Sequence, residues 1–165
     1  MVTITIDNQR IAVDGRLTIL EAAKTAHIEI PHLCYLKGIN DIGACRICAV
    51  ELEGKDRLVT ACNTLVQEGM VIYTNSPKVR HARCNVQLLV SQHDCECAYC
   101  SRSGNCELQK VSNELGITAL PYEKKVTYIP WNQQFPLIRE SNKCIKCMRC
   151  IQICDKVQDL RVWDV

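Results

Sequence analysis

Large aromatic side chains are scarce in this sequence, which limits the core that they can build. Only 5% of the residues are aromatic, and there is a single Phe. Small domains with little apolar core are usually stabilised by disulfides or bound metals. The chain also lacks any apolar run near 18 residues, so the sequence excludes a membrane span.

An excess of one charge is missing as well. The net charge is +2, and the Lys and Arg residues are dispersed, so no basic surface for nucleic acid is predicted. The sequence has no Gly-x-Gly-x-x-Gly fingerprint and no Gly-rich phosphate loop, which argues against a nicotinamide or flavin site. It also offers no candidate nucleophile, general base or substrate pocket. We therefore predict no catalytic residues and leave open whether the chain is part of an enzyme.

Cysteine, in contrast, is abundant, and the thirteen cysteines are regularly spaced. An odd number fits a complete disulfide framework poorly, and we expect no secretory signal before the first strand. These features favour a reducing compartment, most simply the cytoplasm. Leaving out Cys84 and Cys95, eleven cysteines and one histidine form three groups: Cys34, Cys45, Cys48 and Cys62; His93, Cys97, Cys100 and Cys106; Cys144, Cys147, Cys150 and Cys154.

The N-terminal part has the pattern of a small α+β domain. Residues 2–6 and 11–14 alternate apolar and polar side chains, which predicts an antiparallel hairpin. Thr18 and Glu21 are spaced as a capping box at the start of a short helix. Further short strands are expected at residues 47–53, 57–61 and 70–73. This order predicts a mixed sheet over one helix, with the first ligand group largely in loops.

The following part has helical patterns. Ser76 and Pro77 are typical of a helix start, and the apolar spacing after them predicts a helix of about four turns that ends near His93. A second helix is expected from about residue 107 to 115, with Gly116 as its stop. Residues 117–140 contain three prolines and little periodicity, which predicts a linker lying on the surface of its neighbours.

The third ligand group has the most specific spacing, Cys144-x2-Cys147-x2-Cys150-x3-Cys154. Three thiolates at this spacing can hold three irons of a four-iron cluster. A zinc site also uses Cys-x2-Cys, but it needs two separate pairs and no third cysteine in register. The spacing therefore favours iron–sulfur. Either Cys154 closes this cluster, or a residue outside the segment supplies the fourth bond.

The first group, Cys34-x10-Cys45-x2-Cys48-x13-Cys62, differs from plant-type ferredoxin spacing but shares its central Cys-x2-Cys pair. A two-iron cluster needs two thiolates per iron, and these four cysteines meet that need. Gly43 keeps the loop thin, so that backbone N–H groups can approach the sulfurs and raise the potential. Zinc is the competing interpretation, and it weakens beside the third group.

In the second group, the residues alone leave two ligand sets open. Either His93 joins Cys97, Cys100 and Cys106, or Cys95 takes its place. Both sets predict a four-iron cluster. A neutral imidazole in place of a thiolate removes one negative charge, which makes the cluster easier to reduce.

Together, the three groups resemble the N-terminal iron–sulfur region of iron-only hydrogenases. The same region is found in the large iron–sulfur subunit of complex I, the small diaphorase subunit of NAD-reducing nickel–iron hydrogenases and NAD-linked formate dehydrogenases. Four stretches carry the resemblance: Gly43-Ala-Cys-Arg-Ile-Cys-Ala-Val-Glu51; Glu68-Gly-Met-Val71; His93 to Cys106 with Glu107-Leu-Gln109; and Cys144 to Cys154 with Asp155-Lys-Val-Gln158.

The resemblance implies a β-grasp 2Fe-2S ferredoxin domain at residues 1–76. It further implies a small helical 4Fe-4S domain at 77–117 whose ligands are His93 and three cysteines, with Cys95 as a spare. A linker at 118–140 and a partial 4Fe-4S ferredoxin-like segment at 141–165 complete the expected organisation. Such relatives normally continue into a second Cys-x2-Cys-x2-Cys motif, which this sequence does not contain.

The function implied by the resemblance is an electron-transfer subunit or fragment. It would pass single electrons between a flavin- and NAD(P)-binding diaphorase-type subunit and a catalytic oxidoreductase, such as a hydrogenase or formate dehydrogenase, in a hetero-oligomer. The cofactors would be one 2Fe-2S cluster, one 4Fe-4S cluster with a histidine ligand and one further 4Fe-4S cluster. The alternative is a structural interaction module stabilised by zinc.

Overall fold

The structure, a computed structural model, describes residues 1–132, 136 and 138–163. Residues 133–135 and 137 of the predicted linker, and residues 164–165 of the predicted last segment, lie outside the described residues. The chain divides into two compact units: Met1–Arg83 together with Cys147–Val165, and Cys84–Lys146. All strands of the described residues lie in the first unit.

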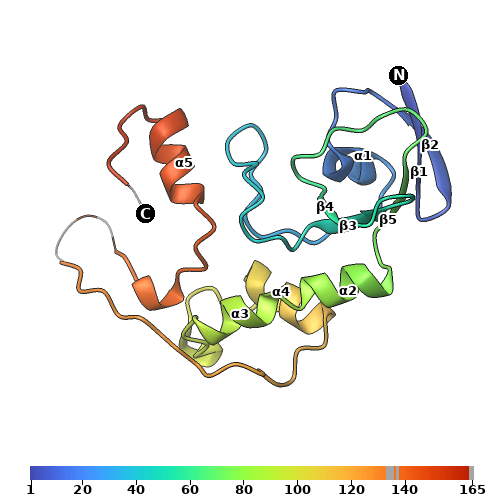
Figure 1. Ribbon diagram of the computed structural model, residues 1–165. Coiled ribbons are helices and arrows are strands. Elements are labelled where there is room, and N and C mark those ends of the chain that lie inside the picture. Colours follow the sequence, from blue (N-terminus) through green and yellow to red (C-terminus); the bar gives the residue numbers. More distant parts are fainter. Residues whose placement is uncertain (133–135, 137, 164–165) are drawn as a thin grey trace. The chain divides into compact units, whose positions relative to one another are not determined.

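The first unit contains a five-stranded mixed sheet (Figure 1). Its strands are β1 (Val2–Ile6), β2 (Gln9–Val13), β3 (Ala49–Leu52), β4 (Val59–Thr60) and β5 (Val71–Tyr73). They lie in the order β2-β1-β5-β3-β4; β1 and β5 are parallel, and the other pairs are antiparallel. The sheet and helix α1 (Ile19–Thr25) form the mixed arrangement that the sequence predicts.

The hairpin and the helix start follow local sequence signals. Asp7 and Asn8 both have positive φ, as a tight two-residue hairpin turn requires, so β2 begins at Gln9, two residues before the predicted start. The capping box is confirmed: Glu21 N–H donates to Thr18 Oγ1 at 3.3 Å, and Thr18 N–H donates to Glu21 Oε2 at 3.1 Å.

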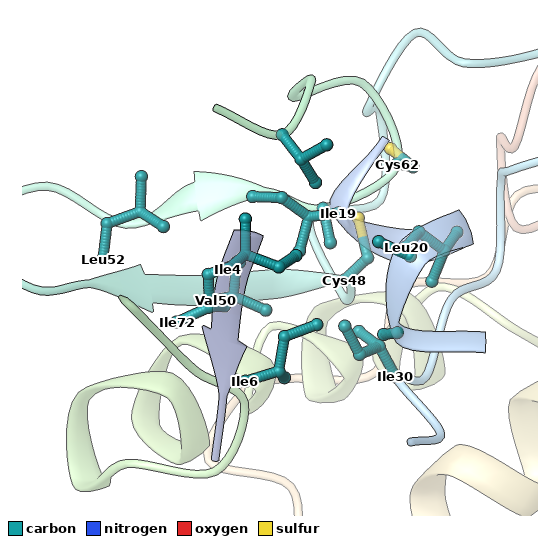
Figure 2. Packing of buried hydrophobic residues seen from close by; sticks show 14 of the residues in the cluster. Ile4, Ile6, Ile19, Leu20, Ile30, Cys48, Val50, Leu52, Cys62 and Ile72 are labelled. Carbon is teal, nitrogen blue, oxygen red and sulfur yellow. The ribbon is translucent and has the colours of Figure 1, made fainter. Parts of the chain in front are cut away.

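The core of this unit is aliphatic, in agreement with the low aromatic content. Figure 2 shows isoleucine and leucine side chains of the sheet facing those of α1. Ile6, Ile19 and Ile72 are fully buried, and burying a side chain of this size stabilises a fold by about 1.5–3 kcal/mol. Cys48 and Cys62 belong to the same buried cluster. Two residues of the first ligand group therefore rest directly on the hydrophobic core.

The predicted four-turn helix after Pro77 is wrong in one respect, because the structure has two shorter helices instead. They are α2 (Pro77–Arg83) and α3 (Val86–Ser91). Between them the backbone tightens: the N–H groups of Gln87 and Leu88 bond to carbonyls three residues back, at 2.9 and 3.1 Å. Val79 and Val86 are both buried, so the apolar spacing alone hides this break. His93 follows the end of α3, as expected.

The second unit continues from α3 with the short turns η1 (Cys97–Tyr99) and η2 (Ser141–Lys143) and helix α4 (Glu107–Glu114). The predicted helix at 107–115 is confirmed; Leu108 and Val111 are buried, and Gly116 has φ of +62°. The described residues of 118–140 contain no helix or strand, and Lys125 N–H donates to Ser91 O at 2.9 Å. The chain at Lys125 therefore contacts the last residue of α3.

Helix α5 (Arg149–Lys156) belongs to the first unit and carries Cys150 and Cys154. Of the helices in the described part of the chain, none is long and apolar enough to cross a membrane.

Candidate iron–sulfur sites

The first ligand group lies in three loops of the β-sheet unit. Cys34 follows α1, Cys45 and Cys48 precede β3, and Cys62 follows β4. Their thiols form two hydrogen-bonded pairs, Cys34 with Cys45 and Cys48 with Cys62. Cys34, Cys48 and Cys62 are buried, and Cys45 is half-buried. Two pairs of thiols match a cluster of two irons with two thiolates each.

Backbone N–H groups point at the sulfurs of this group. Cys45 accepts from the N–H groups of Ile47 and Leu33, and Cys48 accepts from those of Cys62 and Ala61. The Cys34 thiol and these N–H donors lower the pKa of Cys45 to about 5, although burial opposes the shift. The hydrogen bond from the Cys62 thiol likewise lowers the pKa of Cys48. The partner thiols shift the opposite way: Cys45 and burial raise the pKa of Cys34, and Cys48 and burial raise that of Cys62. One thiol of each pair therefore ionises more readily, and the thiolate is the form that binds metal.

The loop between Gly43 and Cys48 has the backbone that this arrangement needs. Gly43 is buried with φ of +66°, and a Cβ there would lie 3.2 Å from the Asn63 side chain. Arg46 also has positive φ, at 59°. A left-handed residue next to right-handed ones can turn neighbouring N–H groups toward one point, which suits an anionic cluster.

Arg83, at the end of α2, fixes the far side of the same loop. Its side chain is buried, with Nε donating to Ile47 O at 3.1 Å and Nη2 donating to Ala49 O at 3.2 Å. These acceptors are the residues on either side of Cys48. The sequence gives no signal for this role, because Arg83 stands 34 residues from Ala49.

The second group is distributed over the loop between α3 and α4. Cys97 opens η1, Cys106 precedes the first residue of α4, and His93 is half-buried after α3. Burial raises the pKa of Cys95, and the nearby thiols of Cys97 and Cys106 raise it further.

The structure places Cys95 against the histidine itself. Its sulfur lies 3.6 Å from His93 Nδ1 and donates toward the His93 carbonyl at 3.4 Å. The contact engages Nδ1, and the His93 ring also hydrogen-bonds to the backbone of Asp94.

The third group spans the division of the chain, with Cys144 in the second unit and the other three cysteines in the first. Lys146 and Met148 have positive φ, and Lys146 N–H donates to the Cys144 sulfur at 3.4 Å. Cys154 is buried, and its sulfur accepts the Val162 N–H at 3.4 Å. The Cys144–Cys150 loop thus also has left-handed residues, and one of them, Lys146, directs its N–H at a sulfur.

None of the eleven cysteines among the ligand candidates, all within the described residues, forms a disulfide. Among the described His, Cys, Asp and Glu side chains, no group of three or more is arranged around the position of a single metal ion. The first group instead consists of the two pairs described above.

Comparison with known families assigns two parts of the chain. Residues 1–77 match the family described as "2Fe-2S iron-sulfur cluster binding domain". Residues 83–120 match the "NADH-ubiquinone oxidoreductase-G iron-sulfur binding region". The resemblance predicted from the cysteine motifs is confirmed. The chain contains a 2Fe-2S ferredoxin domain and a 4Fe-4S binding region.

Individual relatives agree with this assignment. The chain is 43% identical over 165 residues to the NADP-reducing hydrogenase subunit HndD of Solidesulfovibrio fructosivorans, covering 96% of this chain and 28% of that protein. It is 39% identical over 155 residues to the NADPH-Fe(3+) oxidoreductase subunit alpha of Geobacter sulfurreducens, covering 93% and 18%. It is 31% identical over 160 residues to the mitochondrial NADH-ubiquinone oxidoreductase 78 kDa subunit of Candida albicans, covering 94% and 22%.

A solved structure of similar fold is the crystal structure of NAD+-reducing [NiFe]-hydrogenase in the H2-reduced state. It superimposes with a TM-score of 0.83 at 29% sequence identity, covering 93% of this chain and 65% of that one. The chain spans less than a third of the three relatives compared above.

Proposed function

We propose that this chain is an electron-transfer subunit, or the N-terminal part of one, in an NAD(P)-linked oxidoreductase. A flavin- and NAD(P)-binding diaphorase-type partner and a catalytic oxidoreductase partner would exchange single electrons through it. Hydrogenase, formate dehydrogenase and complex I type enzymes are the classes that its motifs resemble. The family matches and the relatives' names support this role.

The single observation that carries the proposal is the paired arrangement of the first group. Two hydrogen-bonded thiol pairs, surrounded by backbone N–H donors, rest on a buried core. Thiolate ligands suit iron–sulfur clusters, and N–H donors to the sulfurs stabilise the reduced, more negative cluster. Cys34 and Cys45 would hold one iron of the 2Fe-2S cluster, and Cys48 and Cys62 the other.

For the second site we propose His93, Cys97, Cys100 and Cys106 as ligands of a 4Fe-4S cluster. The match of residues 83–120 to an iron–sulfur binding region supports a cluster here, and His93 would be its fourth ligand. For the third site we propose Cys144, Cys147 and Cys150, with Cys154 or a residue beyond this sequence as the fourth ligand of a further 4Fe-4S cluster. The domain and linker boundaries predicted above remain part of this proposal.

An anaerobic redox titration followed by EPR tests the proposal. A protein purified without air should show one two-iron signal and at least one four-iron signal, each appearing with a one-electron midpoint. The variant Cys62→Ala should lose the two-iron signal and keep the four-iron signals. A protein that holds zinc and no acid-labile sulfide would instead be a structural module.

The partners require a separate experiment. Under anaerobic conditions, affinity purification of the full-length protein from its own cells should recover a flavin-containing subunit. Addition of NADH or NADPH to that complex should then produce the reduced two-iron EPR signal. If the nucleotides reduce no cluster in a complex that contains the flavin, the proposed coupling to NAD(P) is wrong.

A further inference from the structure

The loop that begins at Cys34 ends at a buried asparagine. Leu36 and Asn40 exchange two backbone hydrogen bonds, each of 2.8 Å, which close this loop tightly. The Asn40 side chain is fully buried. Since its backbone is already hydrogen-bonded within the loop, the amide of the side chain is available for contacts with the rest of the first unit.

The Asn40 amide nitrogen binds the main chain of two predicted cluster ligands. Nδ2 donates to Cys34 O at 2.8 Å and to Cys147 O at 2.8 Å. Cys34 belongs to the first ligand group and Cys147 to the third, and both lie in the first unit with Asn40. One side chain thus joins two ligand-bearing segments that are more than 100 residues apart in sequence, Asn40 and Cys147 being separated by 107 positions.

The amide oxygen of Asn40 differs from the nitrogen, because it makes no hydrogen bond to the described residues. Oδ1 is buried and has no hydrogen-bond partner among the described residues. A buried acceptor without a donor costs free energy that a leucine of similar shape would avoid. The two N–H bonds are therefore the property that distinguishes asparagine from an apolar residue at this position.

Two cations of α5 attach the same loop at its edges. Arg149 donates to Cys34 O at 3.2 Å and to Tyr35 O at 2.9 Å, and Lys156 Nζ donates to Ile39 O at 2.7 Å. The Lys156 bond is exposed, whereas Asn40 is buried beside both ligand residues. Lys156 therefore provides a matched comparison: it holds α5 on the loop without touching a predicted ligand.

We propose that Asn40 is a positioning residue for electron transfer between the first and third groups. Its amide holds the main chains of Cys34 and Cys147 together and provides a direct hydrogen-bonded path between them. One electron would pass from a reduced two-iron cluster to an oxidised four-iron cluster, with no bond broken and no proton moved. This inference rests on the proposed function, because it requires clusters at both groups.

The experiment compares Asn40→Leu and Lys156→Met with the wild-type protein, each full length, anaerobic and loaded with its clusters. A one-electron pulse reduces a small fraction of the protein, and the exchange of the electron between two-iron and four-iron signals is followed by rapid optical and freeze-quench EPR measurements. Midpoint potentials and iron and sulfide content are measured on the same samples. Asn40→Ser, which can donate only one hydrogen bond, is a milder second variant.

Asn40→Leu should slow the exchange several-fold while the midpoint potentials, g-values and iron content stay those of the wild type. Asn40→Ser should be intermediate, and Lys156→Met should exchange at nearly the wild-type rate. If Asn40→Leu does not assemble its clusters, the comparison of Asn40→Ser with Lys156→Met decides.

An unchanged rate in the asparagine variants would overturn the inference alone. So would equal slowing in Lys156→Met, which would mean that only the docking of α5 matters. A wild-type protein that shows both cluster signals but no exchange between them would also refute it and leave the electron-transfer proposal standing. A wild-type protein with neither signal would refute the proposed function itself, and the inference with it.

Discussion

The substitution Arg83→Met tests whether the Arg83 side chain stabilises the loop that carries Cys45 and Cys48. Methionine keeps an unbranched apolar stem but removes the donors to Ile47 O and Ala49 O, at 3.1 and 3.2 Å. Each buried acceptor that loses its donor costs about 1–3 kcal/mol. Relief of the buried guanidinium offsets part of this loss, so the expected net destabilisation of the loop is about 2 kcal/mol.

This magnitude can be measured as the rate at which the two-iron cluster is lost. Because every 1.4 kcal/mol corresponds to a factor of ten, local opening of the loop should become roughly 30 times more populated. With excess iron chelator under anaerobic conditions, the two-iron EPR signal of Arg83→Met should therefore decay about 30 times faster than that of the wild type.

Arg80→Met serves as the control, since Arg80 is exposed and its guanidinium donates to Asn75 O, at 2.8 Å, away from the ligands. Surface substitutions of this kind usually change stability by no more than about 0.5 kcal/mol, so its decay should stay within about threefold of the wild type. Equal decay rates for Arg83→Met and the wild type would refute the idea that Arg83 stabilises this loop. So would an equally fast decay in Arg80→Met.

Three further changes have defined outcomes. His93→Cys should retain a four-iron cluster at a lower midpoint potential in an EPR redox titration, because a thiolate adds negative charge. Cys95→Ser should leave that EPR spectrum unchanged, since a hydroxyl can also accept from Nδ1–H; loss of the cluster would make Cys95 the ligand. Thr18→Ala removes the cap of α1 and should lower the stability by about 1 kcal/mol, seen as a lower thermal midpoint in circular dichroism, with no change in cluster content.

Local signals account for most of what could be predicted from the sequence. The capping box of Thr18 and Glu21, the tight turn before β2 and the helix ended by Gly116 depend only on neighbouring residues, and all three are present. Cysteine spacing likewise predicts the iron–sulfur regions, because a cluster requires thiolates at particular separations along a loop. The family matches over residues 1–77 and 83–120 agree with that prediction.

Contacts between distant residues could not be predicted in this way. The break between α2 and α3 leaves the apolar spacing of Val79 and Val86 intact, so periodicity misses it. Arg83 and Asn40 are ordinary polar residues in the sequence, and only their burial against main-chain carbonyls gives them a role. The ligand assignments, the domain boundaries, the third cluster and the cytoplasmic location stay predictions.

Combined iron, zinc and acid-labile sulfide analysis of the anaerobically purified protein, read together with its EPR spectra, is the most direct test of whether clusters occupy these cysteine groups. We expect iron and sulfide in nearly equal amounts, a reducible two-iron signal and four-iron signals, with zinc absent. Stoichiometric zinc without sulfide, in a colourless protein that shows no EPR signal on reduction, would contradict the electron-transfer role.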